Sequence, residues 1–209
     1  MVAPVTGPTL ARRRGAQRTH PDPQIGFLVP VALLLSGYWR VVLAWLAVSA
    51  PLAIFTLLAV GTGVFHHISQ SLDAVSGVPG PIQSSLLRQL PFPLALMGIA
   101  LVLAVSALIL WRSRGSGPSL PIAVGLISSI LVSPYVNFYD LSALVLAGWL
   151  ILRLDPPRWQ KAVTLAMYVP LFGAPVWPVL TLFCLCGWLV SLAALSPRTR
   201  ALASQRAAA

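Results

Sequence analysis

Four polar residues stand close together between two short apolar runs, residues 120–132 and 141–152. These residues, which we name the polar corner, are Tyr135, Asn137, Tyr139 and Asp140. A carboxylate can take a proton from a hydroxyl group, and hydroxyl and amide groups can hydrogen-bond to the hydroxyls of a ligand. An ionisable residue at membrane depth indicates a functional site, because its exposure to hydrocarbon costs about 3 kcal/mol or more.

A structural role for the same residues stays open. Asp is among the preferred N-cap residues, so Asp140 also fits the cap of a helix that starts at Leu141. Tyr135 and Tyr139 also fit a belt of aromatic side chains at the level of the lipid headgroups. Capping and ligand contact are compatible with each other.

A second candidate, Arg88, lies in the long loop between residues 61 and 93. The apolar residues around it have helical spacing and predict an amphipathic helix over residues 82–90 that lies on the membrane surface. They are Ile82, Leu86, Leu87 and Leu90. On the polar side of that helix, Arg88 would contact the phosphate of a lipid. That lipid would be either a bound substrate lipid or bulk phospholipid.

Neither a metal site nor a cofactor is predicted. His66 and His67 are adjacent and would face different directions on a helix, and no third ligand follows at a suitable spacing. Cys184 and Cys186 lie within an apolar run and have no matching pair elsewhere.

The composition of the 209-residue chain excludes a water-soluble enzyme. Hydrophobic residues make up 57% of it and charged residues only 9%, against about a quarter in soluble domains. The formal net charge is +10. These cations cluster beside apolar segments, so they are interpreted as a signal of membrane topology and not of nucleic-acid binding.

The apolar segments predict an all-α, polytopic transmembrane bundle with about six spans. A crossing takes roughly 20 residues of helix. The predicted spans are Val41–Val60, Leu94–Trp111, Leu120–Val132, Leu141–Leu152, Ala162–Pro175 and Val176–Leu195. With Arg40 inside, nearly all other Lys and Arg that flank these spans also fall inside, as the positive-inside rule requires, while Arg88 and the polar corner fall outside.

The N-terminal region does not follow this pattern of spans and loops. Residues 25–35 are apolar but too short to cross, so they are predicted to be half-inserted, with the preceding arginines cytoplasmic. A signal peptide is the rival interpretation, although no small-residue cleavage site follows. The predicted domains are a disordered basic lead (1–20), an integral membrane helical domain (21–195) and a cytoplasmic tail (196–209).

The order of these features resembles the C-terminal half of glycosyltransferase family 87, the C-type membrane enzymes that use polyprenyl-phosphate sugars. Pro23-Gln24 followed by an apolar half-helix is similar to the Lys-Pro-Gln segment of the family. Ser133-Pro134-Tyr135 and Tyr139-Asp140-Leu141 resemble its Ser/Thr-Pro-His/Tyr and Tyr-Asp-Leu motif. The resemblance covers residues 21–195, and Asp22 replaces the lysine of the family.

The resemblance implies a mannose-type polyprenyl-phosphate donor in a bacterial inner membrane. It implies donor contacts from Gln24, Arg88 and the polar corner. The catalytic aspartate of the family lies in an early extracytoplasmic loop that no segment here matches, so no catalytic residue is assigned. The chain is therefore expected to be inactive alone, with an N-terminal half and membrane lipids as partners. The alternative function is a transporter subunit or an assembly scaffold.

Overall fold

The computed structural model describes residues 26–61, 90–115, 117–133, 136, 138–169 and 177–208. Within these ranges every regular element is helical, which confirms the all-α prediction. The helices are α1 (Leu28–Leu35), α2 (Trp39–Val60), α5 (Phe92–Arg112), α6 (Ser119–Val132), the 3-10 helix η1 (Phe138–Leu141), α7 (Ser142–Leu152), α8 (Arg158–Ala166) and α10 (Pro178–Ala208).

Two helices in the described ranges, α2 and α5, are by length and composition able to cross a membrane, as two of the predicted spans require. They match the predicted spans Val41–Val60 and Leu94–Trp111 but extend outward to include Trp39 and Arg112. Helices α6 and α7 contain 14 and 11 residues and fall short of the roughly 20 that a full crossing takes. The prediction of six spans is therefore met only in part.

The last predicted pair of spans has different bounds in the structure. Helix α8 begins at Arg158 and ends at Ala166, whereas the prediction placed a span over Ala162–Pro175. Residues 170–176 lie outside the described ranges. Helix α10 continues past Leu195 to Ala208, because the Ala, Leu and Arg residues there are strong helix formers.

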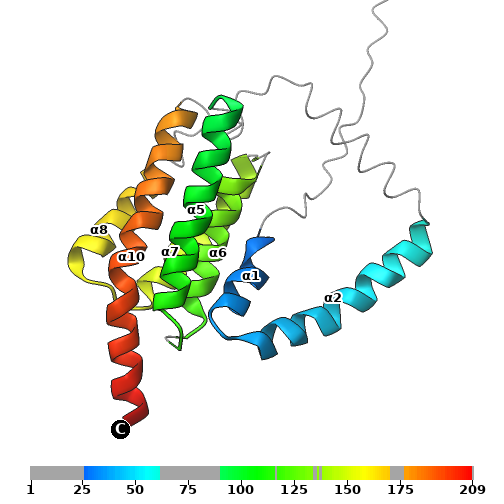
Figure 1. Cartoon of the computed structure of the whole chain (residues 1–209), viewed down its shortest axis with the longest axis horizontal. Helices are drawn as coiled ribbons and strands as arrows, with labels where there is room; N and C mark the ends of the chain where they lie inside the picture. Colours follow the sequence, from blue (N-terminus) through cyan, green and yellow to red (C-terminus); the bar gives the residue numbers. More distant parts are fainter. Residues whose placement is uncertain are drawn as a thin grey trace, which may run out of the picture.

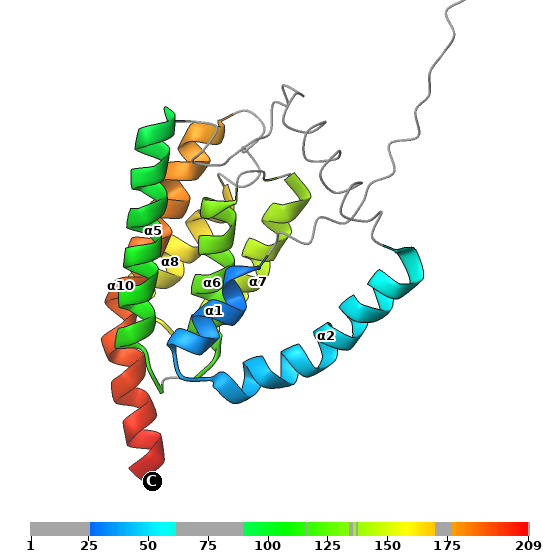
Figure 2. The same cartoon turned by 45° about the vertical axis from the view of Figure 1, so that its right-hand side comes forward.

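Helix α6 is the centre of the bundle. It packs against α1, α5, α7 and α10, and Figure 1 shows it between α1 and α5, with Figure 2 giving a second view of the bundle. None of its residues is exposed, and Leu120, Ile127 and Leu131 are fully buried. Because α6 carries apolar residues on all of its faces, packing against other helices removes each face from solvent.

The short helix α1 occupies the segment predicted to be half-inserted and lies against α6. A Cβ atom added to Gly125 of α6 would stand 2.8 Å from the Cα of Val29 and 3.2 Å from the Cβ of Ala32. The backbone N–H of Leu28 also donates to Ser129 Oγ at 3.0 Å. A small residue at 125 therefore allows the two backbones to approach closely, as in membrane helix pairs.

Helix α2 leaves this bundle after the turn at Gly37, whose φ is 90°. Figure 1 and Figure 2 both show it projecting away from the other helices. Phe55 is 71% exposed and Leu58 80%. The hydroxyls of Ser49 and Thr56 donate to backbone carbonyls of their own helix at 2.8 Å, so this apolar helix satisfies its hydroxyl donors internally, as lipid requires.

The close contact at Gly125 predicts a position-specific effect of adding one methyl group. We expect Gly125→Ala to lower the free energy of unfolding by about 1–3 kcal/mol, the usual cost of overpacking. The matched variant is Gly187→Ala, because Gly187 of α10 has open space around its would-be Cβ. Thermal unfolding in detergent measures both. Equal midpoints for the two variants would contradict the close approach of α1 and α6.

Candidate functional site

The polar corner is described at Asp140 and, for the backbone only, at Tyr139. Both belong to η1, which links the α6 end of the corner to α7. Asp140 is only 4% exposed, although it is a carboxylate. Its neighbours Val136, Leu141 and Leu144 are buried members of the hydrophobic core. The structure thus places an acidic side chain next to the apolar interior.

The N-cap of α7 is a different residue from the one that the sequence predicted. Leu141, and not Asp140, occupies the N-cap position of α7, and α7 itself begins at Ser142. Asp140 lies one residue earlier, within the 3-10 turn. The prediction that Asp140 is the N-cap residue of a helix starting at Leu141 is therefore wrong in its register, because the chain inserts a 3-10 turn before the helix.

The other predicted site residues lie outside the described ranges. These are Tyr135, Asn137, Arg88 and Gln24, together with residues 82–89 of the predicted surface helix. Their roles stay predictions. Within the described residues, no three His, Cys, Asp or Glu side chains come together as a metal site would require.

A polar cluster that the sequence did not predict lies between α8 and α10. Gln160 Nε2 donates to the backbone oxygen of Ser191 at 3.1 Å and lies 3.3 Å from Ser191 Oγ. Ser191 Oγ donates to the carbonyl of Trp188 at 2.7 Å. Gln160, Thr164 and Trp188 are fully buried. We name these four residues the α8–α10 cluster.

The α8–α10 cluster is only partly satisfied. Gln160 Oε1, Thr164 Oγ1 and Trp188 Nε1 find no hydrogen-bond partner in the part of the chain that the structure describes. A buried polar atom without a partner costs about 1–3 kcal/mol. The spacing of Gln160 and Thr164, four residues apart on one helix face, is the one signal in the sequence that could have revealed the cluster.

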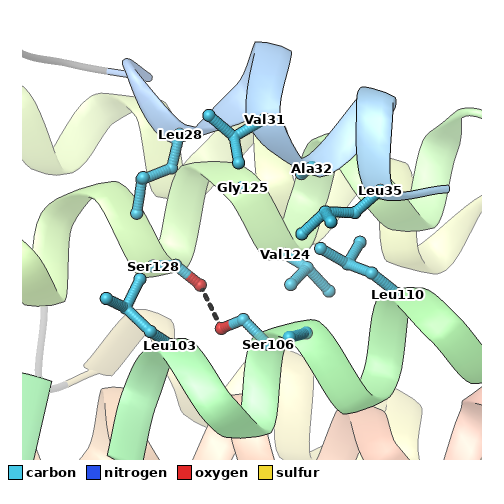
Figure 3. Close-up of a pocket in the computed structure, with 11 residues that line it drawn as sticks. Leu28, Val31, Ala32, Leu35, Leu103, Ser106, Leu110, Val124, Gly125 and Ser128 are labelled. Atoms are coloured by element: carbon cyan, nitrogen blue, oxygen red, sulfur yellow. Dashed lines mark hydrogen bonds between the residues drawn. The ribbon is translucent and has the colours of Figure 1, made fainter. Parts of the chain in front are cut away.

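A shallow crevice runs along α6 between α1 and α5, as Figure 3 shows. Ala32, Leu110 and Val124 line its buried floor, while Val31 and Leu103 on its rim are 46% and 40% exposed. Ser106 and Ser128 hydrogen-bond to each other at 2.7 Å across its floor. Ser106 Oγ also donates to Val102 O at 2.6 Å, so these hydroxyls are already engaged. We name this feature the lateral crevice.

Arginine side chains lie over tryptophan rings at three helix ends. The guanidinium carbon of Arg114 is 4.4 Å from the ring centre of Trp111, and that of Arg153 is 4.6 Å from Trp149. Arg40 lies 5.5 Å from Trp39. Paired cations and indoles at helix ends are typical of the membrane interface.

Two substitutions in the α8–α10 cluster should change the free energy of unfolding in opposite directions. We expect Thr164→Val to raise the free energy of unfolding by about 1 kcal/mol, because it removes a buried hydroxyl that has no described partner at nearly constant shape. Gln160→Ala should lower it by about 2 kcal/mol, because it removes the bond to Ser191 and leaves a cavity. Denaturation in mixed micelles measures both. A loss of stability in Thr164→Val would show that this hydroxyl has a partner.

Comparisons with protein-family models, with curated protein sequences and with solved structures find no match to this chain.

Proposed function

We propose that the chain is the membrane domain of a glycosyltransferase that uses a polyprenyl-phosphate sugar, with the polar corner as part of its donor site. The observation that carries the proposal is the burial of Asp140, which is 4% exposed in the short turn between two apolar helices. A carboxylate held at such a place can accept hydrogen bonds from sugar hydroxyls with little competition from water. The resemblance of Tyr139-Asp140-Leu141 to the family motif supports the same role.

The proposed setting is a bacterial inner membrane that the chain crosses about six times. Arg40, Arg114 and Arg153 lie at helix ends beside tryptophan, and we place these ends on the cytoplasmic side by the positive-inside rule. The polar corner then lies at the opposite, extracytoplasmic end of α6. A lipid-linked donor would present its sugar there, and Arg88, Gln24, Tyr135 and Asn137 are proposed as further contacts.

A transporter subunit or assembly scaffold is the second candidate function. The polar pairs between helices, such as Ser106 with Ser128 and Gln160 with Ser191, are the feature of the described residues that bears on it. These pairs are uncharged and bond one helix to another, which is how membrane helices are held together in proteins of every function. A buried carboxylate such as Asp140 also occurs in the proton relays of transporters, so the resemblance of Tyr139-Asp140-Leu141 to the transferase motif is what favours the first candidate.

The proposed orientation predicts which ends of α5 are accessible. In a Cys184→Ala, Cys186→Ala background, Leu90→Cys should react with a membrane-impermeant maleimide in intact cells. Pro118→Cys should react only after the cells are permeabilised, because Arg112 and Arg114 hold that end in the cytoplasm. The reverse pattern would place the polar corner in the cytosol and remove the donor site proposed above.

The donor site predicts that Asp140→Asn weakens donor binding. We expect photolabelling by a polyprenyl-phosphate-mannose probe to need about ten-fold more probe, because a hydrogen bond to a charged group contributes about 1.5 kcal/mol or more. Asp155→Asn is the control, since Asp155 is 88% exposed and pairs with Lys161 at 2.6 Å. Unchanged labelling of Asp140→Asn at unchanged thermal stability would exclude Asp140 from the donor site.

A further inference from the structure

The two ends of the lateral crevice have different surroundings, because an arginine side chain lies near one of them. Figure 3 shows Leu28, Leu103 and Ser128 at one end and Leu35 with Leu110 at the other. The second end is also near the α5–α6 turn, because α5 ends at Arg112, two residues after Leu110, and Arg114 lies in the turn that follows. The crevice therefore leads from the middle of the bundle to the arginine-bearing helix ends.

Arg114 lies beside Leu35, which lines the crevice at the end that we name its mouth. Its Nε donates to the carbonyl of Leu35 at 2.9 Å, and its guanidinium stacks on Trp111. The adjacent turns are joined as well, since Gly117 N–H donates to Tyr38 Oη at 2.7 Å. The guanidinium is thus held in one place by a neutral carbonyl and a ring, and its remaining N–H groups are available to an anion.

Arg114 has no ion-pair partner in the part of the chain that the structure describes. The acidic side chains in that part are Asp140 and Asp155. Asp155 pairs with Lys161, which lies on α8, and Asp140 lies beyond the opposite end of α6. A positive charge at the mouth of an apolar crevice is therefore left for a ligand that carries a negative charge.

We propose that the lateral crevice binds one acyl chain of an anionic phospholipid, whose phosphate rests on Arg114. The lipid would lie at the cytoplasmic end of α1 and α5, away from the polar corner, so the site is separate from the proposed donor site. Ordered lipid here would cover the exposed apolar rim at Val31, Leu35 and Leu103, which are 46%, 41% and 40% exposed.

The size of the crevice fits a chain segment. Its volume is about 40 Å³, well below the roughly 150 Å³ of an enclosed apolar cavity that holds a benzene molecule. A short stretch of the acyl chain therefore fits inside, and the remaining methylene groups would lie over the open side. Burial contributes about 0.8 kcal/mol per methylene, and one Arg at the surface adds about 1 kcal/mol of attraction to an anionic headgroup.

A lipid chain fits the lining better than a peptide or a second copy of the protein. A peptide would bring backbone amides that need partners, and the crevice offers only Ser106 and Ser128, which already bond to each other and to Val102 O. A second copy would have to supply an anion to Arg114, and the acids in the described residues are buried or already paired. An acyl chain with a phosphate meets both conditions.

The test is native mass spectrometry of the full chain released from nanodiscs that contain phosphatidylglycerol and phosphatidylcholine in equal amounts. We expect one phosphatidylglycerol to be retained in preference to phosphatidylcholine. Arg114→Gln should weaken its retention about five-fold, as the loss of about 1 kcal/mol implies. Ala107→Phe should also abolish it, because Ala107 lines the crevice and a phenyl ring there fills the space.

The matched control is Arg153→Gln, because Arg153 stacks on Trp149 in the same way but follows α7, which contributes no residue to the lining of the lateral crevice. This variant should retain the lipid as the unaltered chain does, and Arg114→Lys should restore part of the binding. Equal losses in Arg114→Gln and Arg153→Gln would overturn the proposal in favour of a general headgroup layer. Retention of both lipids unaffected by Ala107→Phe, or a dimer that Ala107→Phe dissolves, would overturn it as well.

Discussion

The burial of α6, none of whose residues is exposed, is the constraint on which the rest of the structure depends. Every neighbour of this helix must present a complementary face, and four helices do so. The tightest of these contacts, at Gly125, brings the α1 backbone down onto α6 and leaves Leu28 N–H bonded to Ser129. In that position α1 forms one wall of the lateral crevice, and the chain then turns outward at Gly37 into α2.

The length and continuity of apolar runs made the two long helices predictable. Helices α2 and α5 differ from the predicted spans only at their ends, where tryptophan and arginine extend them into the interface. Sequence hydropathy could not show that α6 is covered by protein whereas α7 buries only one face, because lipid and a bundle interior select the same apolar residues. Hydropathy did not predict that α8 begins at Arg158, because the polar residues Gln160, Lys161 and Thr164 interrupt the apolar run.

The candidate site was predictable in kind but not in detail. An aspartate between two apolar runs drew attention to Asp140, and its burial agrees with that choice. The 3-10 turn that displaces Asp140 from the N-cap position is a local backbone choice that no residue spacing in the sequence specifies. The α8–α10 cluster escaped prediction for another reason: Gln160 and Ser191 are 31 residues apart in sequence, and only tertiary packing brings them together.

The polar groups of the bundle fall into three classes by how they meet the cost of an apolar environment. Hydroxyls such as Ser49 and Ser106 bond to carbonyls within their own helix, so they add no demand for a ligand. Arg114 and Arg153 lie at helix ends over indole rings, where their charge can reach water or headgroups. Asp140 alone makes up the third class among the groups named here, because it is ionisable and buried, and it lies at the other end of α6 from Arg114. A site for chemistry is therefore better sought at the polar corner than at any of the uncharged buried pairs, whose hydroxyls and amides hold the helices to one another.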